Sequence, residues 1–168
     1  MAITEVPLPV SHVDSDDFLR DWNPLDEFSP ESQTPPNVLI VGEASKAHEF
    51  AARLIAKLIF DFPHMPVFVV PETPRNAEGE IDKTTEIMNW LGNLENRGLN
   101  PAVIDSETPI PLVYLSNVND LYSETTLARM VSRSRFLGLI VVAVASGMDS
   151  ESATYSNITG MFTHTLEV

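Results

Sequence analysis

The chain has 168 residues, a length typical of one domain, and 43% of them are hydrophobic, which is enough for a packed core. Its formal charge is −14, so it lacks the clustered cations that bind nucleic-acid phosphates, and direct nucleic-acid binding is not expected. The absence of cysteine excludes disulfides and thiolate metal sites, and no secretory signal or membrane-spanning run is visible.

Residues 1–36 differ in composition from the rest of the chain. They hold six of the 13 prolines and eight acidic residues against one basic residue, so they are not expected to build a core alone. We predict an extended, acidic, proline-rich arm here and a separate domain at 37–168. The arm is either a solvated tail or a segment that docks its apolar side chains on its own domain or on a neighbour. The side chains that would dock are Phe18, Leu19, Trp22, Leu25 and Phe28.

From residue 37 onward, apolar β-branched runs alternate with helical patterns. Strands are expected at 37–41, 66–71, 110–115, 137–146 and 161–168, and helices at 45–60, 82–97 and 123–135. The inner face of the first helix is predicted to carry Phe50, Leu54, Ile55, Leu58 and Ile59. Residues 150–160 fit a loop or a short helix. This order predicts an α/β three-layer sandwich with a mostly parallel sheet of about five strands. The last strand either closes this sheet or pairs with another chain.

The stretch "NVLIVGEASKAHE" joins the first strand to the first helix through Gly42. A phosphate-binding Walker A loop has a second Gly for close backbone approach, a Lys for phosphate charge and a hydroxyl for Mg²⁺. The matching positions here are Ala47, His48 and Glu49, and Lys46 comes two positions early. An ordinary strand-to-helix turn is therefore favoured over a phosphate site, although any helix N-terminus attracts anions weakly.

The end of the third strand gives a second test. In P-loop ATPases this strand ends in acids that bind Mg²⁺ and activate water. Here "PLVYLSNVND" places Ser116 and Asn117 at that point. Neutral side chains do neither task, so this catalytic position is also empty. Ser146 follows the fourth strand without a neighbouring base, and the four histidines are dispersed, so neither a catalytic triad nor a metal site is expected.

The chain from about Asn37 to Val168 resembles the DNA-packaging ATPases of large double-stranded DNA viruses, a branch of the P-loop motor superfamily. The stretch "VLIVGEASKAHE" occupies the Walker A place and "PLVYLSNVNDLY" that of Walker B. Arg133 and Arg135 fall near the family's arginine, and Ala145 matches the polar end of its sensor strand. The resemblance implies the fold and a degenerate relative that has lost the catalytic residues.

These observations favour a non-catalytic structural or interaction protein without a cofactor, a P-loop-like relative that is not an enzyme. The resemblance implies an assembly component of a viral particle, found in the virion or in the cytoplasm of the infected cell, with neighbouring subunits as partners. The alternative is a divergent ATP-binding or packaging ATPase in which Lys46 and Arg135 replace the missing groups. A further alternative is an accessory subunit of such a motor, associated with nucleic acid only through its partner.

Overall fold

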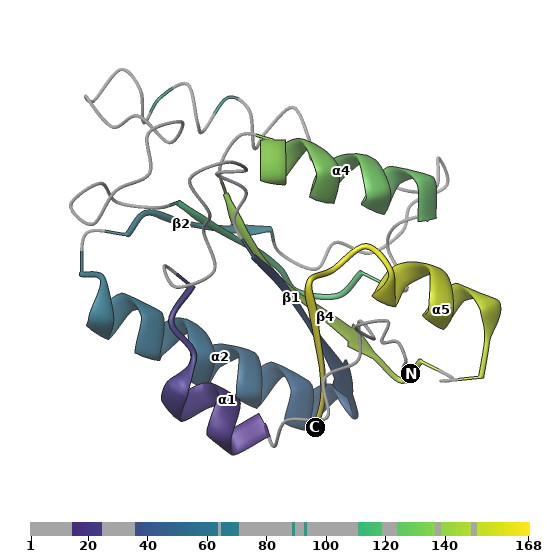
Figure 1. The fold of residues 1–168 in the computed structure, drawn as a ribbon, viewed down its shortest axis with the longest axis horizontal. Coiled ribbons are helices and arrows are strands. Elements are labelled where there is room, and N and C mark those ends of the chain that lie inside the picture. The colour runs from purple at the N-terminus through teal and green to yellow at the C-terminus, as the bar shows by residue number, and fades with distance from the viewer. Residues whose placement is uncertain are drawn as a thin grey trace, which may run out of the picture.

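The structure is a computed structural model that describes residues 15–24, 36–63, 65–70, 111–118, 124–136, 139–148 and 151–168, with the single positions 89 and 93. Its centre is a sheet of five parallel strands in the order β2-β3-β4-β1-β5 (Figure 1). The strands are β1 (Asn37–Gly42), β2 (Val67–Val70), β3 (Leu112–Leu115), β4 (Ile140–Ser146) and β5 (His164–Glu167). The predicted α/β class with a parallel sheet of about five strands is confirmed.

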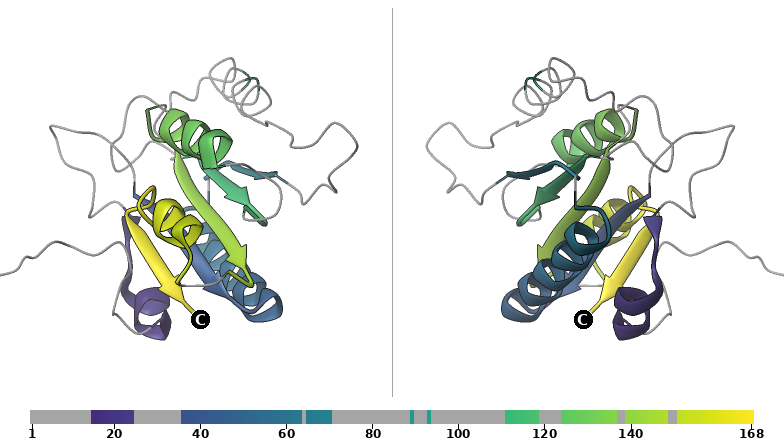
Figure 2. Two further views of the ribbon diagram at one scale, coloured as in Figure 1. Left: turned by 90° about the vertical axis from the view of Figure 1, so that its right-hand side faces the viewer. Right: turned by 90° about the vertical axis from the view of Figure 1, so that its left-hand side faces the viewer.

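The described helices lie on both faces of this sheet. They are α1 (Ser15–Asp21), α2 (Ala44–Asp61), α4 (Glu124–Phe136) and α5 (Ala153–Thr159). α1 and α2 cover one face, and α4 and α5 cover the other (Figure 2). Both faces are covered because the central strands are apolar on both faces, with six successive buried residues in β4. Side chains alternate between the two layers: Val38 and Ile40 face α2, whereas Leu39 and Val41 face α4 and α5.

α2 shows how the sequence pattern places a helix on the sheet. Phe50, Leu54 and Leu58 are buried as predicted, and Ile55 is half-buried. Ile59, however, is 43% exposed, so its predicted place on the inner face is wrong. At about 100° per residue, Ile59 lies well to the side of the stripe that the other residues form, even though it is apolar.

The last strand closes the sheet within its own chain. β5 pairs with β1 in parallel, and Val38 lies opposite His164 in the register. Residues 153–159 form the short helix α5, whose N-cap Ser152 accepts a hydrogen bond from the backbone N–H of Tyr155. The predicted helix at 82–97 lies outside the described residues, apart from positions 89 and 93.

Candidate functional site

The turn after β1 contains a single residue, Glu43, because β1 ends at Gly42 and α2 begins at Ala44. The first bond of the helix is already made there: the backbone N–H of Ala47 donates to the carbonyl oxygen of Glu43 over 2.8 Å. A phosphate-binding loop needs several residues outside the helix, so that their N–H groups can surround the anion. The residues that would form such a loop here belong to the first turns of α2.

The structure gives each of the predicted phosphate-loop positions a different place. Ala47 is fully buried on the side of α2 that faces the sheet, so a ligand cannot reach it. His48 is half-buried, and its Nδ1 lies 3.2 Å from the hydroxyl of Tyr114 on β3, in a hydrogen bond. Burial raises the pKa of the Tyr114 phenol. Lys46 and Glu49 are exposed at the surface. These side chains therefore do not converge on one ligand position.

Gly42 is required for a close backbone approach. A Cβ atom at this position would lie 2.5 Å from the backbone oxygen of Val168, a distance that no real side chain tolerates. The end of β5 comes this close because the N–H of Val168 donates to the carbonyl oxygen of Val41 over 2.9 Å. On the other side, the N–H of Gly147 donates to the carbonyl oxygen of Gly42 over 3.1 Å. Gly42 thus lets the end of the sheet pack tightly, a role that glycine has wherever backbones meet.

A carboxylate of the chain itself stands at the N-terminus of α2. Glu43 is the N-cap residue, and its Oε1 accepts a hydrogen bond from the Ser45 hydroxyl over 2.8 Å. Negative charge is favourable at the positive end of the helix dipole, so Glu43 stabilises the helix start. The same charge repels a phosphate group from the exposed N–H groups of that turn.

The carboxyl ends of β1, β4 and β3 lie side by side at this edge of the sheet. Gly42 is paired with Ser146, and Leu115 is paired with Ala143. β1 continues into α2 on one face, whereas β4 continues towards α5 on the other. The gap between β1 and β4 is thus the topological switch point, where open α/β sheets bind ligands. Its described residues include Glu43, Ser146 and Gly147, the last with a φ of 68°.

The predicted second catalytic position holds structural contacts. Ser116 donates its hydroxyl to the carbonyl oxygen of Val70 over 3.2 Å, which ties the end of β3 to that of β2. Asn117 is 6% exposed, and its Oδ1 has no hydrogen-bond partner among the described residues. Ala145, at the predicted sensor position, is fully buried and paired with Val41. Among the described residues, no three His, Asp or Glu side chains gather as metal ligands would.

The predicted arginine sensors lie at the end of α4. Arg133 and Arg135 belong to the last turn of this helix, and their side chains are outside the description. A role for either arginine at the switch point therefore stays a prediction.

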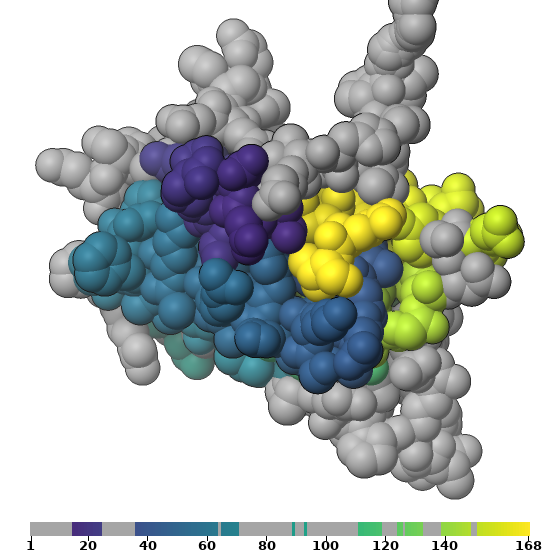
Figure 3. Space-filling model, turned by 90° about the horizontal axis from the view of Figure 1, so that it is seen from below, coloured from purple at the N-terminus to yellow at the C-terminus, as the bar shows by residue number. Residues whose placement is uncertain are grey.

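A second site lies where α1 packs on α2 and β5, and we call it the α1 groove. Phe18 and Trp22 fill it and are only 6% and 8% exposed. Their rings stack with centroids 4.8 Å apart, and both meet the ring of His164 on β5 edge-on. Figure 3 shows α1 lying on α2 beside β5. Leu19 packs against the same core, while Leu25 and Phe28 lie outside the described residues.

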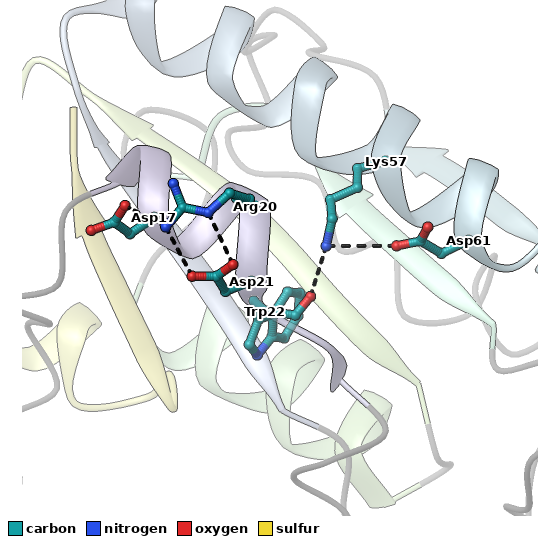
Figure 4. Close-up of polar contacts among 6 residues, drawn as sticks. All are labelled: Asp17, Arg20, Asp21, Trp22, Lys57 and Asp61. Atoms are coloured by element: carbon teal, nitrogen blue, oxygen red, sulfur yellow. Dashed lines mark hydrogen bonds and ion pairs between the residues drawn. The ribbon is translucent and has the colours of Figure 1, made fainter.

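Lys57 supplies a polar contact between α2 and α1. Its Nζ donates to the carbonyl oxygen of Trp22 over 3.0 Å and lies 3.6 Å from Asp61 Oδ2 (Figure 4). A cation at this position suits the carbonyl end of α1. The contact between Lys57 and Trp22 was not predicted, because it depends on where α1 docks.

Three charged side chains of α1 form ion pairs within the helix. Arg20 contacts Asp17 at 2.8 Å and Asp21 at 3.0 Å, and its hydrogen bond lowers the pKa of the Asp21 carboxyl. All three side chains are exposed, so these ion pairs contribute little to stability. The positive charge of Lys57 on α2 also contributes to the lowered pKa of Asp21.

None of the described helices is long and apolar enough to cross a membrane. A comparison with models of known protein families and with curated proteins found no match to this chain.

Proposed function

We propose that this chain is a non-catalytic interaction protein built on a P-loop-like α/β scaffold, and that it acts by binding other protein subunits. The observation that carries this proposal is the one-residue turn at Glu43, which puts the would-be phosphate loop inside α2. The buried Ala47 and the bonded His48 support it, because neither is free to meet a nucleotide.

The order of the strands supports the P-loop-like part of the proposal. The resemblance assigns Walker A to the end of β1, Walker B to the end of β3 and the sensor to β4. β4 lies between the other two strands, so all three ends share one edge of the sheet. That arrangement suits a motor fold, while Ser116 and Ala145 leave two of the matching positions without the family's polar or acidic residues.

The class of partner follows from charge. A chain with a formal charge of −14 disfavours nucleic acid as a direct partner and leaves other proteins as the partner class. The resemblance to packaging ATPases adds that the partners are neighbouring subunits of a viral particle, in the virion or in the infected cell, and that part of the proposal rests on the resemblance alone.

The test is calorimetry of the full chain with ATP and Mg²⁺, with phosphate release measured on the same sample. We expect no heat of binding up to millimolar nucleotide and no turnover. Micromolar binding that is lost in Lys46→Ala would overturn the proposal in favour of a divergent nucleotide-binding protein. Lys57→Ala is the matched control, since this lysine contacts Trp22 and lies away from the turn.

A further inference from the structure

α1 depends on its groove for its own structure. It has only seven residues, and an isolated helix of that length is unstable in water. Its apolar contacts come from Phe18 and Trp22, one turn apart on the same face. Its ion pairs are internal to the helix. α1 therefore depends on an apolar surface and on the nearby cation of Lys57.

The groove provides the apolar surface and the cation from two elements, β5 and α2. His164 on β5 presents its ring 5.4 Å from Phe18 and 6.0 Å from Trp22, and Lys57 on α2 meets the end of α1. β5 is an outer strand of the sheet, and α1 lies at that side of the molecule (Figures 2 and 3). The groove thus holds a short helical segment through two aromatic residues four positions apart.

The chain between α1 and β1 is long enough to reach another molecule. Pro24 and Pro36 are twelve residues apart in the sequence, which allows a span of about 40 Å, comparable with the diameter of a domain of this size. Residues 25–35 belong to the arm that the sequence predicts to be extended, and they contain two prolines, three acids and no basic residue.

We propose that the α1 groove also binds residues 15–24 of a second copy of this chain, so that neighbouring copies exchange α1. This inference rests on the proposed function, because it names the partner as another copy. Exchange costs no contact, since the groove makes the same bonds to either segment. Attachment in the same chain gives α1 an effective concentration of roughly millimolar, so exchange grows when copies are crowded or held side by side in an assembly.

Cross-linking of full-length chains tests this directly, because the chain contains no cysteine of its own. A tagged Asp21→Cys chain is mixed with an untagged Asp61→Cys chain, and both positions lie near Lys57. A short thiol cross-linker should join tagged to untagged chains, with a yield that rises with protein concentration. The matched control replaces Asp61→Cys by Ser132→Cys, an exposed position on α4, on the opposite face of the sheet.

The expected yield is several-fold above that control, and adding Trp22→Ala to the tagged chain should bring it back to the control value. Equal yields for the two mixtures up to millimolar protein would overturn the exchange. A yield that is unaffected by Trp22→Ala would do the same, since it would show contact without docking of α1.

A second measurement uses a labelled peptide of residues 13–26 and the Phe18→Ala/Trp22→Ala chain, whose groove lacks its aromatic occupants. The peptide should bind this variant at least about tenfold more tightly than the wild type, whose groove is occupied. Absence of binding to a variant that still unfolds cooperatively would contradict the proposal. ATP binding by the chain would contradict the proposed function but would not change the cross-linking or peptide-binding results. Failure of the proposed function and failure of the α1 exchange can therefore be told apart.

Discussion

The turn after β1 and the α1 groove are both places where the chain could meet a ligand, and they differ in how their polar groups are used. At the turn, Glu43 and Gly42 are already engaged with neighbouring parts of the chain, through the Ser45 hydroxyl and the end of β5. At the groove, the occupant is a short segment with two buried aromatic side chains, exposed ion pairs around Arg20 and a hydrogen bond from Lys57. At this turn the helix starts one residue after the strand ends at Gly42, and we propose no phosphate site there. The short helix α1, which is held by its own two aromatic side chains, is the better candidate for a site that a second copy could occupy.

Gly42→Val is expected to have the largest effect on stability, and it tests the structural role of the turn. Its Cβ would meet the backbone oxygen of Val168 at 2.5 Å, so the end of β5 would have to move. We expect a loss of about 3 kcal/mol in the free energy of unfolding, measured by denaturant titration. Gly160→Ala is the control, because its nearest contact is an ordinary 3.5 Å. Equal losses for the two variants would show that Gly42 is not needed for close packing.

Trp22→Ala tests the other region and is expected to cost about 2 kcal/mol. A wholly buried Trp loses more, but α1 lies at the surface and can undock before the domain unfolds. Hydrogen exchange of the α1 amides should accelerate, while that of β4 changes little. The control is Leu19→Ala, which truncates a half-buried neighbour on the same helix. Unchanged protection of α1 in Trp22→Ala would mean that the groove does not hold the helix.

The bond between α5 and β5 gives a pH-dependent prediction that bears on the strand beside the groove. The Tyr155 hydroxyl donates to Glu167 over 3.0 Å, and burial, together with this bond, raises the pKa of Tyr155 to about 12. Because the pKa of Tyr155 is higher in the folded than in the unfolded state, its protonated form stabilises the fold. This contribution is complete below the unfolded pKa of about 10 and is lost as the pH rises from 10 towards 12. Tyr155→Phe should therefore cost about 1 kcal/mol at neutral pH.

The quantity to measure is the difference in unfolding free energy between wild type and Tyr155→Phe. Other tyrosines and lysines titrate in the same pH range, but their contributions are the same in both proteins and cancel in this difference. It should shrink between pH 10 and 12. A difference that is constant across this range would contradict a role for the Tyr155–Glu167 bond.

The smallest effect is expected where a motif is rebuilt. The triple variant Ala47→Gly, His48→Lys and Glu49→Thr restores the Walker A residue types at their proper spacing. It should still show no heat with ATP and Mg²⁺, because these positions remain within α2 and the turn remains one residue long. Micromolar binding by this variant would mean that residue types alone decide the site and that the shape of the turn is irrelevant.

Residue types and their periodicity determined the class of fold. The apolar runs of β1 and β4 predicted buried parallel strands, and the spacing of Phe50, Leu54 and Leu58 predicted the inner face of α2, because burial of an apolar stripe is a local property of the pattern. The missing lysine and hydroxyl of the Walker loop were also visible in the sequence, since those positions are counted from Gly42.

Contacts between distant segments were decided by the tertiary structure. That Gly42 makes room for Val168, that His48 meets Tyr114, and that β5 pairs with β1 depend on chain segments brought together only in the fold. The docking of Trp22 on Lys57 and His164 is of the same kind, because an amphipathic pattern shows which face of a helix is apolar and carries no information about the surface that receives it.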